Sequence, residues 1–423
     1  MAGQQAESKA ARDTGHAARA LSLDDARERI LAQLTPIAMT ERVAIRRALD
    51  RVLAEHVVSR LNVPAHTNSA MDGYAVRAAD LPASGQIALR LVGDAFAGKP
   101  FAGEVHVGEC VRIMTGGVVP RGADTIVIQE DVQRQGGEVV IGAGHRAGQH
   151  VRKAGEDLAA GATVLAAGRR VTAADLGLFA SLGIGEVNVR RRLRVAFLST
   201  GDELRSLGEP LGEGDVYDSN RYTLYGMLTH FGADILDLGV VPDSPGALRA
   251  AFERAGADAD VVITSGGVSV GAADHVRDVL AEVGEVGFWK VNMKPGKPIA
   301  FGRLHGGATF FGLPGNPVSA MVTYYQLVQP ALDYLAGAQP RVPVVMMARA
   351  GEDLRKSSGR REFQRGRLEW DEDDEPVVYS AAPQGSGILR SMSLADCFIV
   401  LSENSGPVKA GERVRVELFA GLT

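Results

Sequence analysis

The sequence has little cysteine, no long apolar run and no strong excess of either charge. Cys110 and Cys397 are its cysteines in 423 residues, too few for a disulfide framework or a cysteine metal cluster. A reducing compartment is therefore expected, and we predict a cytoplasmic protein. No stretch approaches the roughly 18 uninterrupted apolar residues of a membrane-spanning helix, so no membrane partner is expected. Residues 1–20 lack the apolar core of a signal peptide and predict a disordered tail.

The charges of the chain nearly cancel. The 46 basic and 51 acidic side chains give a formal net charge of -5. Because no strong basic field is present to hold polyanions, nucleic acid is not expected as a partner. At roughly 100–200 residues per domain, the length predicts several domains, each with a core of its own.

The first half of the chain predicts a helix followed by a small β domain. Ser22 is placed to cap a helix over about Leu23 to Leu34, whose apolar residues share one face. Residues 56–150 contain short Val and Ile runs broken by Gly and Pro, which indicates a small, mostly β domain. The mixed segment from Val151 to Arg194 is interpreted as a return connection beside the first helix, and its final basic run as a solvated face.

Strands and helices alternate from Val195 to Leu335. The buried-type strand Val195–Ser199 is followed by a helix over Ser219–Phe231, and the same alternation continues to residue 338. This pattern predicts a parallel, doubly wound α/β sheet, whose ligands bind beyond the carboxyl ends of the strands. In residues 339–423 the helical period disappears, and short apolar runs predict a C-terminal β-barrel-like domain.

Polar residues follow the strands of this sheet where ligands are expected. Thr200, Gly201, Asp202 and Glu203 follow the first strand, and Asp218 and Asp243 lie on further loops of the same edge. Clustered carboxylates repel one another unless a hard cation such as Mg²⁺ neutralises them and bridges substrate phosphates. The third strand ends at Ser265, and the glycines Gly266 and Gly267 let backbone N–H groups approach an anion. A glycine-rich turn alone is more often a tight turn, but its neighbourhood here favours a functional site.

Two further loops carry features that suit an anion. Lys290, Lys294 and Lys297 lie in a segment whose prolines restrict the backbone, although a solvated loop is the alternative. The residues that lead into the next predicted helix are Pro314, Gly315, Asn316 and Pro317. Asn316 is a plausible N-cap, and the helix start offers free N–H groups to an anion, although a rigid structural turn explains the pattern equally well.

Several motifs together resemble the molybdopterin molybdenumtransferase family, whose relatives include the C-terminal domain of gephyrin. The motifs are Asn68–Ala75, Arg112–Gly116, Ser199–Leu204, Ser265–Gly271, Lys294–Pro298 and Leu313–Pro317. They occur in the order of the family, and the likeness extends from Leu21 to Phe419. One departure is His66-Thr67, where the family often has an aromatic residue and an acid.

The resemblance implies an enzyme that inserts molybdate into adenylylated molybdopterin and releases AMP, with Mg²⁺ as cofactor. It implies an α/β domain over 195–338 related to molybdopterin adenylyltransferase, an inserted β domain, an elongated connecting domain built from 21–55 and 151–194, and a C-terminal domain. It also implies a homodimer with composite active sites, and the upstream adenylyltransferase is a possible partner. The alternatives are adenylyl transfer to molybdopterin and a gephyrin-like dimeric scaffold without turnover.

Roles for individual residues follow from this resemblance and from the negative charge of both substrates. Glu203 and Asp274 are assigned to Mg²⁺, and Lys290 and Lys294 to the incoming oxyanion. Asp243 orients a lysine or a water, while Asp72 and Thr115 reach in from the β domain. The residues expected to contact phosphate, pterin or molybdate are Thr200, Gly201, Ser265, Gly266, Gly267, Ser269, Lys297, Pro314, Gly315, Asn316, Pro317, Arg365 and Ser386.

Overall fold

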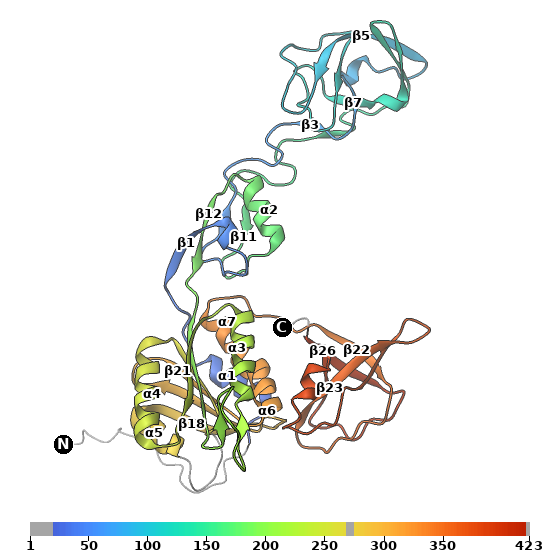
Figure 1. Ribbon diagram of the computed structural model, residues 1–423. Helices are drawn as coiled ribbons and strands as arrows, with labels where there is room; N and C mark the ends of the chain where they lie inside the picture. Colours follow the sequence, from blue (N-terminus) through green and yellow to red (C-terminus); the bar gives the residue numbers. More distant parts are fainter. Residues whose placement is uncertain (1–19, 268–274, 420–423) are drawn as a thin grey trace, which may run out of the picture. The chain divides into compact units, whose positions relative to one another are not determined.

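The computed structural model describes residues 20–267 and 275–419 (Figure 1). It separates into two compact units, which we describe one at a time. The main unit comprises Met1–Glu41 and Arg190–Thr423, and the inserted unit comprises Arg42–Val189. Among the described residues, no helix is long and apolar enough to cross a membrane. The finer division of the chain into five parts stays a prediction.

A mixed sheet forms the centre of the main unit. Its strand order is β16 (Asp234–Val241), β13 (Arg194–Thr200), β17 (Val261–Ser265), β21 (Thr309–Leu313), β20 (Pro298–Leu304) and β18 (Gly284–Lys290). Strands β16, β13, β17 and β21 are parallel, as predicted, whereas β20 runs antiparallel to both of its neighbours. The expectation of a wholly parallel sheet was therefore wrong at this edge. Only a short turn separates β20 from β21, and so short a connection joins antiparallel strands.

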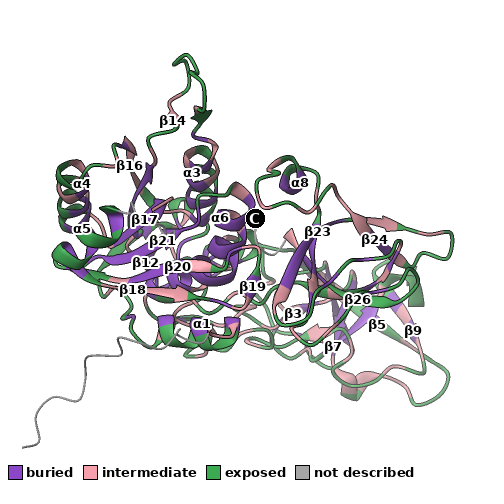
Figure 2. Cartoon of the chain, turned by 90° about the horizontal axis from the view of Figure 1, so that it is seen from below, coloured by how far each residue is buried: buried purple, intermediate pink, exposed green. Residues whose placement is uncertain are grey.

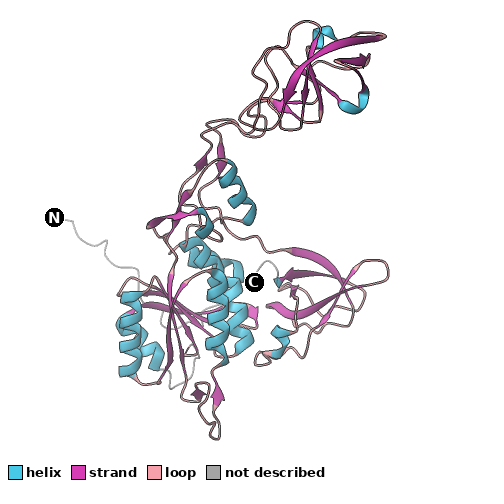
Figure 3. Ribbon diagram, turned by 45° about the horizontal axis from the view of Figure 1, so that its top comes forward, coloured by secondary structure: helices cyan, strands magenta, loops and turns pink. Residues whose placement is uncertain are grey.

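Helices cover both faces of this sheet, which confirms the doubly wound arrangement (Figure 3). Helices α4 (Pro245–Asp258) and α5 (His275–Val283) pack on one face, where Phe252 and Val279 join the core beneath the strands. Figure 2 shows how thoroughly the central strands are buried. On the other side lie α1 (Leu23–Leu31), α3 (Ser219–Phe231), α6 (Pro317–Thr323) and α7 (Gln329–Leu335). Helix α3 contacts β13 and β16, α6 contacts β21, and α1 packs against α7.

Two helices differ in detail from their predictions. The Ser22 hydroxyl accepts a hydrogen bond from the Asp25 N–H at 3.0 Å and caps α1 as expected, but the helix ends at Leu31. The single helix expected from Pro317 to Leu335 contains a π-helical turn over Tyr324–Val328 between α6 and α7. The side chains of this turn are buried.

The C-terminal part of the main unit is a closed β-barrel, as predicted. Its strands are β22 (Val345–Ala350), β23 (Arg361–Trp370), β24 (Pro376–Ser380), β25 (Cys397–Leu401) and β26 (Arg413–Leu418). Closure comes from the pairing of β23 with β25. The short strand β19 (Met293–Lys294) extends from the α/β part and pairs in parallel with β23, so it joins the barrel to the central sheet.

The basic run that ends the return connection is not simply a solvated face. Arg191 donates to both carboxylate oxygens of Asp260, at 2.9 and 3.1 Å. Arg192 donates to the Gly232 carbonyl at 2.6 Å. The Arg191 side chain is 19% exposed, so these arginines tie the start of β13 to neighbouring loops.

The inserted unit contains a small β domain, as predicted, while its expected bounds of 56–150 stay a prediction. Its sheet has the order β7 (Thr125–Ile128), β4 (Gly73–Val76), β6 (Glu109–Ile113), β5 (Gln86–Ala95), β9 (Glu138–Gly142) and β8 (Val132–Gln135). In the same unit, β2 (Val57–Val58) pairs with β11 (Thr163–Leu165), and α2 (Ala173–Ser181) packs beside them. Segments far apart in the sequence therefore share one core.

Candidate active site

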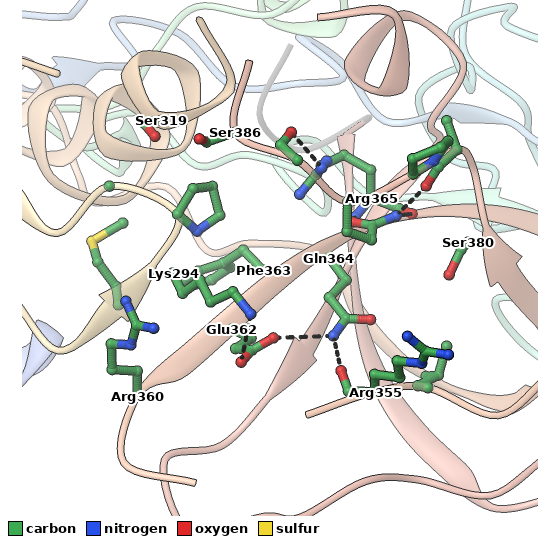
Figure 4. A pocket seen from close by; sticks show the side chains of 18 of the residues that line it. Lys294, Ser319, Arg355, Arg360, Glu362, Phe363, Gln364, Arg365, Ser380 and Ser386 are labelled. Atoms are coloured by element: carbon green, nitrogen blue, oxygen red, sulfur yellow. Dashed lines mark hydrogen bonds and ion pairs between the residues drawn. The ribbon is translucent and has the colours of Figure 1, made fainter. Parts of the chain in front are cut away.

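A cavity of about 850 Å³ lies where the central sheet and the barrel of the main unit meet (Figure 4). Its wall is formed by residues 293–298, 352–355, 362–365 and 382–386, together with Ser319, Arg360 and Ser380. The cations in this wall are Lys294, Lys297, Arg355, Arg360 and Arg365. Of the residues expected to bind the substrates, the structure brings Lys294, Lys297, Arg365 and Ser386 together here.

Lys294 is positioned by the pairing of β19 with β23. The register of the two strands sets Lys294 beside Glu362, and the ammonium Nζ lies 3.3 Å from the carboxylate Oε1. The Lys294 side chain is 47% exposed, whereas that of Glu362 is 3% exposed. The ammonium therefore contacts a buried carboxylate on one side and the open cavity on the other.

Arg365 is a buried cation with neutral partners. It lies on β23 and is 1% exposed. Its Nε donates to the Ser391 hydroxyl at 3.0 Å, and Nη2 donates to the Gly385 carbonyl at 3.1 Å. Burial lowers the pKa of Arg365 to about 10, so the guanidinium is still charged at neutral pH. A buried charge that is balanced by neutral oxygens favours an anion beside it.

The start of α6 contributes to the same wall in an unexpected way. Asn316 is the N-cap and Pro317 the first residue, as predicted, but the Asn316 side chain makes no capping bond to the described residues. The Val318 N–H donates to the Ser386 carbonyl at 3.1 Å. This donor was expected to be free for an anion, and instead it fixes the Ser386 loop against the α/β part.

A second group of predicted residues meets at the carboxyl edge of the sheet. The amide Nδ2 of Asn220 donates to the Ser265 hydroxyl at 2.6 Å and to the Gly315 carbonyl at 2.7 Å. The Gly266 N–H donates to the Leu313 carbonyl at 3.1 Å, so this donor is not free for phosphate, contrary to expectation. A Cβ at Gly266 would lie 2.5 Å from the Thr200 carbonyl, which places the ends of β13 and β17 in close contact.

The carboxylates of this edge lie on adjacent loops. The Asp243 N–H lies 3.4 Å from Asp202 Oδ1, and the Glu203 carboxylate lies over Gly201. One oxygen each of Asp218 and Asp243 is buried without a hydrogen-bond partner in the described part of the chain. Among those same residues, no three acidic, histidine or cysteine side chains form a metal-binding group. Ser269 and Asp274 lie outside the described residues.

Lys290 is not among the residues that line the cavity. It is the exposed last residue of β18, where its backbone pairs with Pro298 and its carbonyl accepts from the Leu21 N–H at 2.8 Å. Spacing in the sequence suggested one lysine cluster, but the strand end directs Lys290 and Lys294 into different surroundings. Its assignment to the oxyanion stays a prediction.

In the inserted unit, the structure brings Asp72 and Thr115 together. Asp72 Oδ1 accepts from the Thr115 N–H at 2.7 Å and from the Thr115 hydroxyl at 2.8 Å. The backbone bond, followed by the side-chain bond, lowers the pKa of Asp72 below its ordinary value. The pair lies at the surface, in loops that follow β3 (Asn68–Ser69) and β6.

Sequence reasoning missed Glu362, Gln364, Arg355 and Arg360 in the cavity, and Asn220 at the sheet edge. For Asn220 a signal was available, because it lies in the first turn of a predicted helix that starts at the ligand-binding edge of the sheet. For Glu362 no local signal exists, since its lysine partner is 68 positions away in the chain.

Comparisons with known families cover most of the chain. The model described as MoeA N-terminal region (domain I and II) matches residues 21–183. The model of a probable molybdopterin binding domain matches 196–334, and that of the MoeA C-terminal region (domain IV) matches 347–419.

Curated relatives and a solved structure agree with these matches. The chain is 45% identical over 404 residues to the molybdopterin molybdenumtransferase of Haemophilus influenzae, covering 95% of this chain and 99% of the relative. It is 35% identical to the protein of the same name from Nostoc, covering 89% and 88%. The crystal structure of the molybdopterin biosynthesis moeA protein from Pyrococcus horikoshii superposes with a TM-score of 0.82 at 28% identity, covering 95% of this chain and all of that one.

Proposed function

The chain belongs to the molybdopterin molybdenumtransferase family, and we propose that it inserts molybdenum from molybdate into adenylylated molybdopterin and releases AMP. The observation that carries the proposal is the cationic cavity beside the carboxyl edge of the sheet. Buried Arg365 with neutral partners, flanked by Lys294 and Lys297, suits a tetrahedral oxyanion. Adenylyl transfer to molybdopterin would leave this cavity without a use.

The main task of such a site is to neutralise the negative charges of its substrates, because molybdate and the phosphates are both anions and repel each other. Arg365 and Lys294 lower the free energy of bringing the oxyanion beside a second anion, and the Ser386 loop supplies further polar groups. Lys297 provides another positive charge in the same wall. We assign the pterin and the AMP moiety to the sheet edge, where Thr200, Ser265 and Gly315 lie close together.

We propose that a Mg²⁺ ion binds among the carboxylates at the sheet edge. Asp243 Oδ1 and Asp218 Oδ2 are buried without a partner among the described residues, and uncompensated carboxylate oxygens favour a cation. We propose Glu203 and Asp274 as its ligands. When bound, Mg²⁺ would neutralise the pyrophosphate charge. The protein's own part is to hold Glu203 over Gly201 and to anchor the neighbouring loops through Asn220.

We further propose a homodimer in which Asp72 and Thr115 of one subunit complete the site of the other. Support comes from the Asp72–Thr115 pair itself, which fixes a surface carboxylate without a packing role. An isologous dimer would contain two equivalent composite sites. We place the reaction in the cytoplasm, in keeping with the two buried, unpaired cysteines.

Molybdate-dependent release of AMP tests the proposed function. The protein is incubated with adenylylated molybdopterin and Mg²⁺, with and without molybdate, and the nucleotide is separated and quantified. Molybdate should accelerate AMP release strongly. An equal rate of release in its absence, or formation of adenylylated product from molybdopterin and ATP, would contradict the proposal.

A further inference from the structure

A buried carboxylate interrupts the cationic wall of the cavity. Glu362 accepts a hydrogen bond from Lys294 Nζ at 3.3 Å through Oε1 and one from Gln364 Nε2 at 3.1 Å through Oε2. Glu352 and Asp353 also line the wall, but they are exposed, so water screens their charge. The charge of Glu362 is screened much less, and it opposes any anion that enters the cavity.

Lys294 is positioned to interact both with Glu362 and with an anion in the cavity. Its ammonium faces Glu362 on one side and the open cavity on the other, since the lysine is half-exposed and the glutamate is buried. Gln364 also donates to the Arg355 carbonyl at 2.7 Å, and this second bond anchors the amide that holds the carboxylate. Glu362 is therefore held in place, whereas the Lys294 ammonium can pair either with Glu362 or with an anion in the cavity.

We propose that Glu362 is a positioning residue that competes with the oxyanion for Lys294 and thereby limits how tightly the cavity holds molybdate. The inference rests on the proposed function. In the empty cavity Lys294 pairs with Glu362, and an arriving oxyanion takes over part of that pairing. When molybdenum passes to the pterin, Glu362 recovers the ammonium. Weak retention suits a substrate that has to leave its first binding position.

The test is the affinity for sodium molybdate alone, measured by titration calorimetry on the full-length protein. Glu362→Gln keeps the size of the side chain and removes its charge. It should tighten molybdate binding about fivefold, on the scale of a partly exposed ion pair that is no longer in competition. Glu369→Gln is the matched control, because it makes the same change on the same strand outside the cavity. The control should change the affinity less than about twofold.

A Lys294→Met background separates competition from simple repulsion. If Glu362 acts through Lys294, the gain from Glu362→Gln should fall below about twofold when Lys294 is absent. A gain of the same size in both backgrounds would show repulsion alone and would overturn the inference. Unchanged or weaker binding by Glu362→Gln, with an unchanged unfolding temperature, would also overturn it.

If Glu362→Gln does not fold, Glu362→Asp serves in its place. The shorter side chain keeps the charge and draws it away from Lys294, so the affinity should rise by a smaller factor. An affinity equal to or below that of the wild type would contradict the inference. If the wild-type protein itself fails to bind molybdate, the proposed function falls together with it, whereas wild-type binding that does not respond to these changes refutes the Glu362 role alone.

Discussion

Single side chains set the electrostatics of both sites. Lys294 has an exposed ammonium that a buried glutamate orients, and Arg365 is a buried guanidinium bonded to neutral oxygens. Asp72 is stabilised in its charged form by one threonine. Substitutions at Lys294 and beside Asp72 should therefore change a specific quantity, the molybdate requirement or a carboxyl pKa, rather than only the stability of the fold.

Lys294→Ala should raise the molybdate concentration for half-maximal turnover at least about tenfold, the scale of a lost charge-assisted hydrogen bond. Binding of adenylylated molybdopterin should weaken much less, because the pterin is assigned to the sheet edge. Steady-state kinetics and calorimetry measure the two quantities. Arg367→Ala removes one positive charge from the exposed part of β23, outside the cavity. An equal shift in that variant would show that overall charge, rather than the cavity, sets the molybdate requirement.

The Asp72 carboxyl should titrate below its ordinary pKa, and Thr115→Val should raise that pKa only part of the way, because the backbone bond remains. A depressed pKa in the folded state makes the stabilisation complete above the unfolded value of about 4. The stabilisation is lost as the pH falls through the folded pKa. Carboxyl NMR of the labelled protein gives both titrations. Identical curves for wild type and variant would contradict the contribution of the hydroxyl.

At the scale of elements, the glycine turn after β17 brings two strand ends together. Gly266 has φ 95°, and a Cβ there would lie 2.5 Å from the Thr200 carbonyl. Gly307 has the same φ of 95° with open space around it. Alanine substitutions at these two glycines therefore distinguish the cost of backbone strain, which both share, from the cost of a steric clash, which only Gly266 has.

Gly307→Ala should cost about 1–3 kcal/mol of stability through its backbone conformation alone. Gly266→Ala should cost more, since the backbone of Thr200 has to move, and it should also weaken pterin binding. Thermal unfolding and pterin titration measure these effects. Equal destabilisation of the two variants, with pterin affinity retained, would mean that the close approach to Thr200 has no role in the site.

Much of the architecture was predictable because it is encoded locally. The alternation of apolar strands with capped helices predicted α3 at its observed bounds, Ser219–Phe231, and the short runs after Pro340 predicted the barrel. Strand β20 was missed because its first residue, Pro298, continues a proline-containing loop. Its antiparallel direction depends on pairing with β18 and β21, which no local pattern reports.

The sequence predicted some of the loops and residues that contribute to the candidate site, but it did not predict their hydrogen-bond and ion-pair partners. Lys294, Arg365 and Ser386 were expected to contact the substrates from the family resemblance, and the structure places them in the wall of one cavity. The partner of Lys294 could not be found in this way, because it depends on the register between β19 and β23. Similarly, the N–H groups of Gly266 and Val318 suggested free donors until their carbonyl partners were known.

At the scale of the whole molecule, the residues with proposed roles are divided between the two units. Asp72 and Thr115 belong to the inserted unit, and the cavity and the sheet edge belong to the main unit. The proposed homodimer with shared sites would give all of them a function.

Subunits with Asp72→Ala and with Glu203→Ala should each form nearly inactive homodimers. A heterodimer purified through two different tags would contain one site with both defects and one with neither. Its activity should therefore recover toward half of the wild-type value. A mixed dimer as inactive as its parents would mean that Asp72 and Glu203 act within one chain, or that Asp72 has only a structural role.

The most direct measurement is the mass of the pterin after reaction. The protein is incubated with adenylylated molybdopterin, Mg²⁺ and molybdate, and the pterin is released and analysed by mass spectrometry. We expect a product that has lost the adenylyl group and gained molybdenum, formed in step with AMP and reduced strongly by Lys294→Ala. A pterin that loses its adenylyl group without gaining molybdenum, or that remains adenylylated, would contradict molybdenum transfer as the function of this protein.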